Sequence, residues 1–300
     1  MWLQWASISN RNTGQTAAIP DPTVSPIHHR GVAPLPLMAV PPPWLRDLAG
    51  AWVFYSLLPG WPGVNPGFER IARFAPWIGL VIGGLQAGLW LLLQAIGWSV
   101  VATVPVLIAV ALWVTGGLHL DGVMDTADGL AAGANRRLEA MEDSRVGASG
   151  VLALILVLLL QFSALVALAE HCTRWMPFVL LSAAFWGRCA PLWAVLRFPY
   201  LKADGTAGFH RSSAKGLREW TPALVVVVAC LLGACLLGVG LPVLLIGAAG
   251  FCISGLVADR LGHRLGGHTG DSYGASVVWT ETLLLVVLAL LSPVWRGAAG

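Results

Sequence analysis

The chain has 300 residues, of which 57% are hydrophobic and 11% are charged, and its formal net charge is +3. This composition is far from that of a water-soluble domain of the same length, so the sequence indicates a membrane protein. The small net charge and the scattered basic residues exclude a nucleic-acid-binding protein, and we expect lipid and small molecules as partners. The five cysteines show neither CxxC nor metal-ligand spacing and are interpreted as packing residues.

Residues 1–44 are rich in Pro, Ser, Thr and Asn and contain no apolar run long enough for a signal peptide. We predict that they form a flexible N-terminal tail and that residues 45–297 form a single transmembrane domain.

Seven apolar runs are long enough, or nearly so, to cross the hydrocarbon layer as helices. The predicted fold is therefore an all-α integral membrane bundle of about seven transmembrane helices. A shorter run at 48–61 is interrupted by Pro59 and predicts an additional interfacial or re-entrant N-terminal helix. The seven runs are residues 77–97, 99–115, 151–169, 176–196, 221–239, 241–257 and 279–295.

Lysine and arginine residues are distributed unevenly between the two sides of the predicted spans. The segments before the first span and after the second, fourth and sixth hold twelve of them, whereas the opposite side holds two. Because short cytoplasmic loops carry an excess of basic residues, we expect the first set to face the cytoplasm. The C-terminus should then lie on the opposite side of the cell inner membrane. The twelve are Arg46, Arg70, Arg73, Arg136, Arg137, Arg145, Lys202, Arg211, Lys215, Arg218, Arg260 and Arg264, and the two are Arg174 and Arg296.

Three aspartates, Asp121, Asp125 and Asp128, follow the second run at spacings of four and three. On a helix these carboxylates share one stripe and repel each other. A hard cation such as Mg²⁺, which binds carboxylates and substrate phosphates, would relieve the repulsion, and we prefer this interpretation to a solvated acidic helix end. His119, two residues earlier, is a candidate general base or partner of a ligand, although a lone loop histidine is more often simply polar.

Arg145 follows in the same loop, beside Asp143 and Ser144, and its guanidinium is suited to bind a phosphate. Alternatively, Arg145 is only one of the basic residues that mark the cytoplasmic side of the membrane. Arg188 lies inside the fourth apolar run, where a charge is costly unless it faces a polar cavity or an anionic partner. Snorkelling to the surface is the alternative there.

The Gly-rich loop expected at 264–275 contains Thr269, Gly270 and Asp271. Glycines let backbone amides approach phosphate oxygens, and Asp271 adds another oxygen ligand. The signal is weak alone, but this loop is predicted to lie on the same side as the aspartates.

Three motifs closely resemble those of the cobalamin synthase family, the adenosylcobinamide-GDP ribazoletransferases. They are GLHLDGVMDTADG at 117–129, DSRVGA at 143–148 and GHTGDSYGA at 267–275. The resemblance extends over about residues 45–290, and the first block is specific enough to rank above a fold analogy. The resemblance implies that the transmembrane domain of residues 45–297 is the catalytic domain.

The resemblance implies that α-ribazole, or its 5′-phosphate, attacks the cobinamide-linked phosphate of adenosylcobinamide-GDP and displaces GMP in an Mg²⁺-dependent reaction at the cytoplasmic face. Whether the protein forms a homo-oligomer stays open. The implied metal ligands are Asp121, Asp125 and Asp128, which with His119 and Arg145 are the implied catalytic residues. The implied substrate-binding residues are Asp143, Ser144, Arg188, Thr269, Gly270 and Asp271.

Two alternatives remain at this point. The residues from Asp125 to Gly129 begin like the aspartate motif of CDP-alcohol phosphotransferases, but Gly133 stands where that motif needs Arg. A cation-coupled secondary transporter could use the same carboxylates, but the acids do not lie near the middle of a span, where transporter sites form.

Overall fold

In the computed structural model the described residues are 41–202 and 213–298, with side chains described as far as Ser292. Most of the tail predicted at residues 1–44 therefore lies outside the described residues, and that prediction stays untested.

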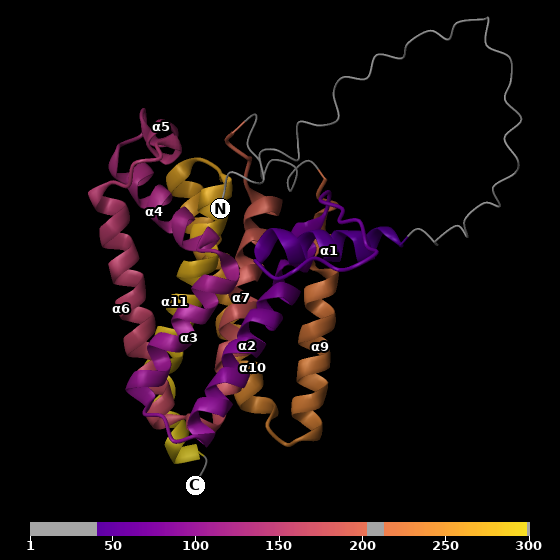
Figure 1. The fold of residues 1–300 in the computed structure, drawn as a ribbon, viewed down its shortest axis with the longest axis vertical. Helices are drawn as coiled ribbons and strands as arrows, with labels where there is room; N and C mark the ends of the chain where they lie inside the picture. Colours follow the sequence, from indigo (N-terminus) through magenta and orange to yellow (C-terminus); the bar gives the residue numbers. More distant parts are fainter. Residues whose placement is uncertain (1–40, 203–212, 299–300) are drawn as a thin grey trace, which may run out of the picture. The chain divides into compact units, whose positions relative to one another are not determined.

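The described chain folds into helices and forms no β-sheet (Figure 1). Each of the seven predicted spans coincides with one long helix, which confirms the predicted fold class. The long helices are α2 (Ala75–Ala95), α3 (Val100–Thr115), α6 (Ala148–His171), α7 (Met176–Arg197), α9 (Thr221–Leu236), α10 (Gly240–Leu265) and α11 (Gly270–Ala298). The shorter ones are α1 (Pro43–Tyr55), η2 (Ile71–Phe74), α4 (Leu118–Ala131), α5 (Arg137–Glu142), η3 (Thr173–Trp175) and η4 (Gly216–Trp220).

Six of the described helical segments are long and apolar enough to cross a membrane, and α3 with α4 would make a seventh span that is bent by 89°. The bend follows from Gly116 and Gly117, whose φ values of 62° and 74° place two successive residues in the left-handed region. Residues with a Cβ adopt this region at a cost of about 1–2 kcal/mol each, so the Gly-Gly pair lets the chain turn sharply here.

The helices α10 and α11 are longer than the sequence predicts. The helix α10 continues to Leu265 and α11 begins at Gly270, so the loop expected at 264–275 shrinks to residues 266–269. The predicted run ends at 257 because the following segment is less apolar, with Asp259, Arg260 and His263. A helix needs no apolar side chains outside the bilayer, so α10 continues through these residues.

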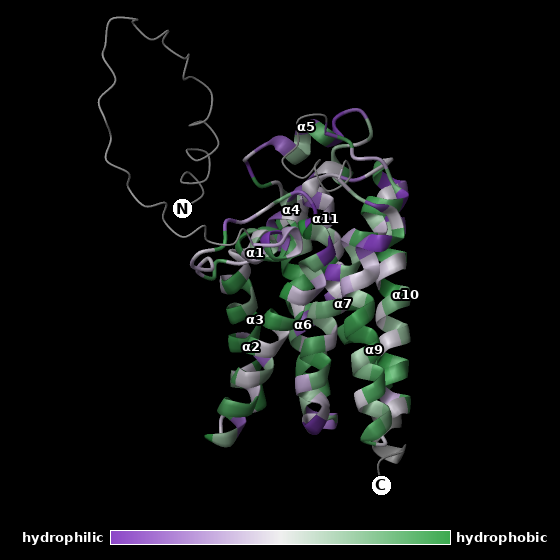
Figure 2. Cartoon of the chain, turned by 90° about the vertical axis from the view of Figure 1, so that its right-hand side faces the viewer, coloured by the Kyte–Doolittle hydropathy of each residue, from purple (hydrophilic) through white to green (hydrophobic). Residues whose placement is uncertain are grey.

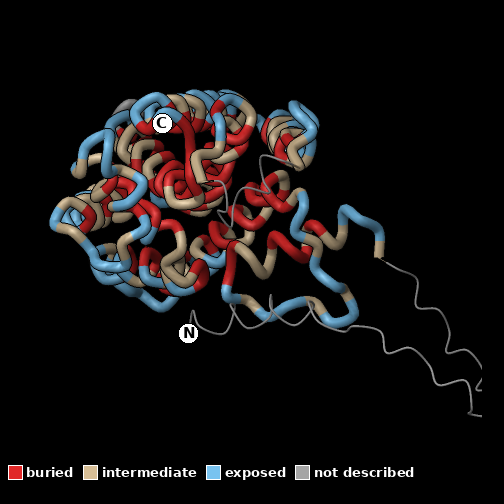
Figure 3. Tube along the Cα trace, turned by 90° about the horizontal axis from the view of Figure 1, so that it is seen from above, coloured by how far each residue is buried: buried red, intermediate tan, exposed pale blue. Residues whose placement is uncertain are grey.

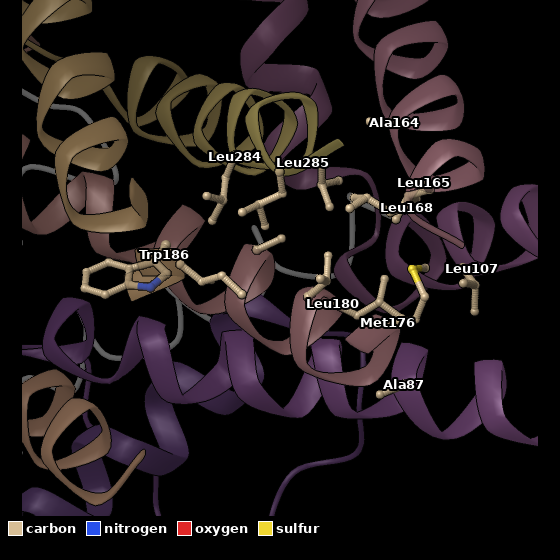
Figure 4. Close-up of a cluster of buried hydrophobic side chains, with 14 of the residues drawn as sticks. Ala87, Leu107, Ala164, Leu165, Leu168, Met176, Leu180, Trp186, Leu284 and Leu285 are labelled. Carbon is tan, nitrogen blue, oxygen red and sulfur yellow. The ribbon is translucent and has the colours of Figure 1, made fainter. Parts of the chain in front are cut away.

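α7 is the central helix: 15 of its 22 residues are buried, compared with 2 of the 16 in α9. Figure 3 shows buried segments gathered in the middle of the bundle. Glycines bring α2 against α7: a Cβ at Gly79 would overlap the carbonyl oxygen of Ala184, and one at Gly83 would overlap that of Leu180. This spacing of small residues is typical of close helix contacts in membranes. Leu107, Leu165, Leu180 and Leu284 fill the adjoining core (Figure 4).

We call the end of the bundle that carries α1, α4 and α5 the site end. Hydrophilic segments gather there, whereas the helices below are mostly apolar (Figure 2). The predicted additional N-terminal helix corresponds to α1, which lies at 43–55 and not at 48–61, and its 13 residues are too few to cross a bilayer. An ion pair of 2.6 Å between Asp47 and Arg73 holds α1 to η2.

Candidate active site

α4 crosses the first turns of α11 in close contact. A Cβ at Gly122 would overlap the carbonyl oxygen of Asp271, and one at Gly274 would lie 3.2 Å from the Cα of His119. Because both helices present glycine at the contact, Asp121 on α4 and Asp271 on α11 line the same cavity. The crossing thus brings together two motifs that are 150 residues apart in the sequence (271 − 121).

Asp125 lies one turn beyond Asp121 and interacts electrostatically with both Asp121 and Asp271. Lys202, which follows α7, places its Nζ 3.0 Å from Oδ2 of Asp271 and 3.7 Å from Oε1 of Glu142. We call Asp121, Asp125, Asp271 and Lys202 the acidic cluster. It holds three carboxylates and one cation, and Lys202 had been interpreted from the sequence only as a topology signal.

The N-terminus of α11 is capped by Thr269 and Ser272. The backbone N–H of Thr269 donates to Oγ of Ser272 over 2.8 Å, and the N–H of Ser272 donates to Oγ1 of Thr269 over 3.2 Å. This reciprocal arrangement satisfies two amides at the helix start. Thr269 is buried, and its hydroxyl also donates to Oδ2 of Asp271 over 3.3 Å. Thr269 therefore orients Asp271, while Gly270 beside it lines the cavity.

His268 is buried in the short connection between α10 and α11. Its Nε2 lies 3.1 Å from the carbonyl oxygen of Ala258, and its Nδ1 lies 2.9 Å from Oγ of Ser272. The carbonyl needs a donor, so we assign the proton to Nε2. Burial lowers the pKa of His268 to about 4, so the ring is neutral at physiological pH.

Asp128 does not point toward Asp121 and Asp125. Its Oδ2 accepts a hydrogen bond of 2.7 Å from the N–H of Gly147, and its Oδ1 accepts one of 2.8 Å from the N–H of Gly150. The carboxylate thus caps the N-terminus of α6, where a negative charge is favourable. The three aspartates do share α4, as predicted, but the third is occupied by a structural contact.

Asp143, Ser144 and Arg145 lie in the loop between α5 and α6. Both carboxylate oxygens of Asp143 accept hydrogen bonds from the Arg145 guanidinium, at 2.6–3.2 Å. These bonds lower the pKa of Asp143 to about 2. The Arg145 side chain is 87% exposed, and Ser144 is also exposed. No contact joins Asp143 or Arg145 to the acidic cluster among the described residues, so the structure does not bring these three predicted site residues into it.

A cavity of about 130 Å³ opens beside the acidic cluster. His119, Asp121, Arg188 and Asp271 line its polar side, and Tyr55 of α1 lies against His119 with ring centroids 6.3 Å apart. A cavity of this size holds a phosphate-sized group, while the rest of a large substrate would extend beyond it.

Arg188, on α7, is buried and forms an ion pair of 2.5 Å with Glu281 of α11. Its Nη1 also donates to the carbonyl oxygen of Ala184 over 2.9 Å, whereas its Nε has no hydrogen-bond partner among the described residues. A Cβ at Gly187 would collide with Glu281, so this glycine makes room for the acid. The predicted anionic partner of Arg188 is thus a carboxylate of the same chain.

Glu281 was missed by the sequence analysis, although an acid inside an apolar run is a recognisable signal. With Arg188, His119, Gln86 and Gln161 it lines a second, smaller cavity of about 60 Å³ in the bundle. Arg188 and His119 therefore line both cavities.

The donor atoms of the acidic cluster suit a hard divalent cation, because its acidic side chains offer only oxygen. In the part of the chain that the structure describes, no three His, Cys, Asp or Glu side chains are arranged to hold a metal ion by themselves. Mg²⁺ commonly takes one or two carboxylates and completes its shell with water and substrate phosphate. Asp121 and Asp125 fit such a shared site.

The long apolar helices define a multi-pass membrane protein, and the acidic cluster lies at one end of its bundle. The chain belongs to the family described as cobalamin-5-phosphate synthase, whose model matches residues 47–289. This match confirms the resemblance seen in the three sequence motifs.

Relatives in several cyanobacteria carry the name adenosylcobinamide-GDP ribazoletransferase. The protein from Prochlorococcus marinus strain MIT 9313 is 56% identical over 259 residues, which cover 84% of this chain and 98% of that protein. The protein from Trichormus variabilis strain ATCC 29413 is 39% identical over 254 residues, which cover 83% of this chain and 98% of that protein. No solved structure matches the chain significantly.

Proposed function

We propose that this protein is an adenosylcobinamide-GDP ribazoletransferase that joins α-ribazole, or its 5′-phosphate, to adenosylcobinamide-GDP and releases GMP. Family membership over residues 47–289 carries this proposal. It is supported by the crossing of α4 and α11, which places the first and third motifs around one cavity.

The reaction is a displacement at phosphorus. The attacking hydroxyl oxygen of the ribazole forms a bond to the cobinamide-linked phosphorus, the bond from this phosphorus to the GMP oxygen breaks, and the hydroxyl loses its proton. Catalysis of such a step depends mainly on positioning and on neutralising charge. We propose Arg188 and Lys202 as the cations that neutralise this charge and His119 as the group that accepts the proton.

We propose Asp121 and Asp125 as the ligands of Mg²⁺, with Asp271 facing them across the helix crossing. The ion would neutralise phosphate oxygens and orient the substrate. Repulsion among the three carboxylates supports this assignment, because a cation would relieve it. We propose a capping role for Asp128 in place of metal binding, since Gly147 and Gly150 already occupy its oxygens.

We further propose that the site end faces the cytoplasm of a cell whose inner membrane the bundle crosses. The excess of basic residues in the loops of this end supports that orientation. Neither a CDP-alcohol phosphotransferase nor a transporter is supported by the family match or by the names of the relatives.

The direct test is GMP release from adenosylcobinamide-GDP by the purified protein in nanodiscs. Parallel reactions with α-ribazole and with α-ribazole 5′-phosphate would identify the acceptor. Reactions with and without Mg²⁺ would test the cofactor separately from the activity. Absence of GMP release with both acceptors, from folded protein and with Mg²⁺ present, would overturn the proposed function.

A further inference from the structure

An apolar groove of about 450 Å³ lies on the face of α4 opposite to the acidic cluster. Val123, Ala127 and Leu130 line it from α4, and α6, α10 and α11 contribute the remaining wall. On a helix these positions point away from Asp121, Asp125 and Asp128. The groove is therefore separate from the candidate active site, although the same helix borders both.

Two arginines border this groove. Arg260 and Arg264 are one turn apart on the last turns of α10, both are exposed, and neither has an ion-pair partner among the described residues. Nearby Asp259 instead pairs with Arg197 and His263. Arginines at this end also fit the expected topology of the chain, but that preference alone does not explain why they border an apolar groove.

A buried threonine is also among the residues that line the groove. Thr126 is 3% exposed, and its Oγ1 has no hydrogen-bond partner in the described structure. Because protein atoms enclose this Oγ1, the hydroxyl does not face the groove, and the charged groups that border the groove are the two arginines.

The groove follows α10 from a basic end to an apolar end. On α10 the lining residues extend from Arg264 to Leu256, which at 1.5 Å per residue is about 12 Å along the helix. The basic end of this stretch lies at the site end, and the apolar end lies toward the middle of α10. An amphiphile with an anionic head and an apolar chain fits this order of charges.

We infer that this groove binds one phospholipid with an anionic headgroup, whose phosphate contacts Arg260 and Arg264 and whose acyl chain lies between α4, α10 and α11. The guanidinium groups suit phosphate oxygens, and juxtamembrane arginines attract anionic lipids. Because the groove joins α4 to α10 and α11, the lipid would stabilise the crossing that forms the active site. The inference rests on the groove itself and not on the proposed reaction.

The test compares nanodiscs of phosphatidylcholine with nanodiscs that also contain phosphatidylglycerol. We expect phosphatidylglycerol to raise the Tm of the wild type and to be retained as one bound lipid in native mass spectrometry. The variant R260Q/R264Q should lose both effects. The control R174Q/R218Q removes the same charge away from the groove and should retain them.

A second variant, A127F, fills the groove without changing its charge and should also lose the bound lipid. Equal lipid retention by wild type, R260Q/R264Q and A127F would overturn the inference. So would a stable dimer of the wild type that crosslinks through position 127, because a second copy of the chain would then occupy the groove. If either variant fails to fold, the two lipids are instead allowed to compete for the wild-type protein at equal concentration. Displacement of the bound phosphatidylglycerol by phosphatidylcholine would contradict the inference.

Discussion

The buried Arg188 and the partly buried Glu281 form an ion pair that joins α7 to α11 beside the cavity of the site end. Removing Glu281 would leave the arginine buried without a counter-charge, which typically costs about 3–5 kcal/mol. We therefore expect Glu281→Gln to lower the Tm substantially in a thermal unfolding assay. The amide oxygen of the glutamine could still accept a hydrogen bond from Nη1, as the carbonyl oxygen of Ala184 does, but neither group carries a counter-charge.

The double variant R188M/E281Q separates the structural role of this pair from its role at the site. It should recover much of the lost Tm because it removes both charges. GMP release should stay low, since Arg188 also lines the cavity. Recovery of both stability and GMP release would contradict the proposal that Arg188 neutralises phosphate charge.

Asp121→Asn and Asp125→Asn should each lower GMP release by about 100-fold or more, as is typical when a charge-stabilising group is removed from an active site. The remaining activity should require more Mg²⁺, because an anionic ligand is lost. Stability should stay unchanged or rise slightly, since each change relieves repulsion within the acidic cluster. Asp143→Asn is the control, because Asp143 contacts Arg145 and not the cluster. Normal turnover in both variants would contradict the metal assignment.

Asp128→Asn should behave differently from these two variants. An amide places an NH₂ group where one of the two N–H donors of α6 now binds, so we expect a loss of about 1–3 kcal/mol of stability. The Mg²⁺ concentration needed for half-maximal GMP release should remain near the wild-type value. An increased Mg²⁺ requirement with unchanged stability would instead support the metal role that the spacing of the aspartates predicts.

The contrast between Asp125 and Asp128 shows what the sequence could and could not predict. Apolar runs locate the seven long helices, and the spacing of the aspartates places all three correctly on one helix. The direction of each carboxylate depends on α6, whose N-terminus approaches α4 only after 16 residues of intervening chain, 132–147. No local pattern encodes that approach.

Lys202 and Glu281 are residues of the site region that the sequence motifs did not identify. Lys202 resembles any other basic residue at the end of a span, and its role becomes visible only when α11 places Asp271 within 3.0 Å. Glu281 carried a usable signal, because an acid within an apolar run needs a partner. Pairing it with Arg188 would have predicted the contact between α7 and α11.

Gly122→Ala tests whether the close approach of α4 and α11 forms the site. The new Cβ would overlap the carbonyl oxygen of Asp271, so the helices must separate, at a cost of about 1–3 kcal/mol. GMP release should fall by more than the lost fraction of folded protein explains. Gly88→Ala is the matched control, because its Cβ would meet no atom within 4 Å. Equal activity in the two variants would show that the spacing of this crossing is unimportant.

His268 predicts how stability depends on pH. In the folded protein its pKa is lowered to about 4, compared with 6.5 for an unperturbed histidine. Between these values the unfolded chain binds a proton that the folded chain does not, so the free energy of unfolding decreases as the pH falls from 6.5 to 4. For the single proton of His268, the free energy of unfolding should decrease in total by on the order of 3 kcal/mol.

His268→Gln should therefore flatten the dependence of Tm on pH in this range, even if the variant is less stable at neutral pH. The comparison uses the slope between pH 6.5 and 4, since glutamine replaces only part of the hydrogen bonding to Ala258 and Ser272. His263→Gln is the control, because the side chain of His263 is 68% exposed and its titration should contribute little. If the two variants and the wild type lose Tm with the same slope, His268 is not buried as a neutral ring, and the packing of the α10–α11 connection must differ from the one described.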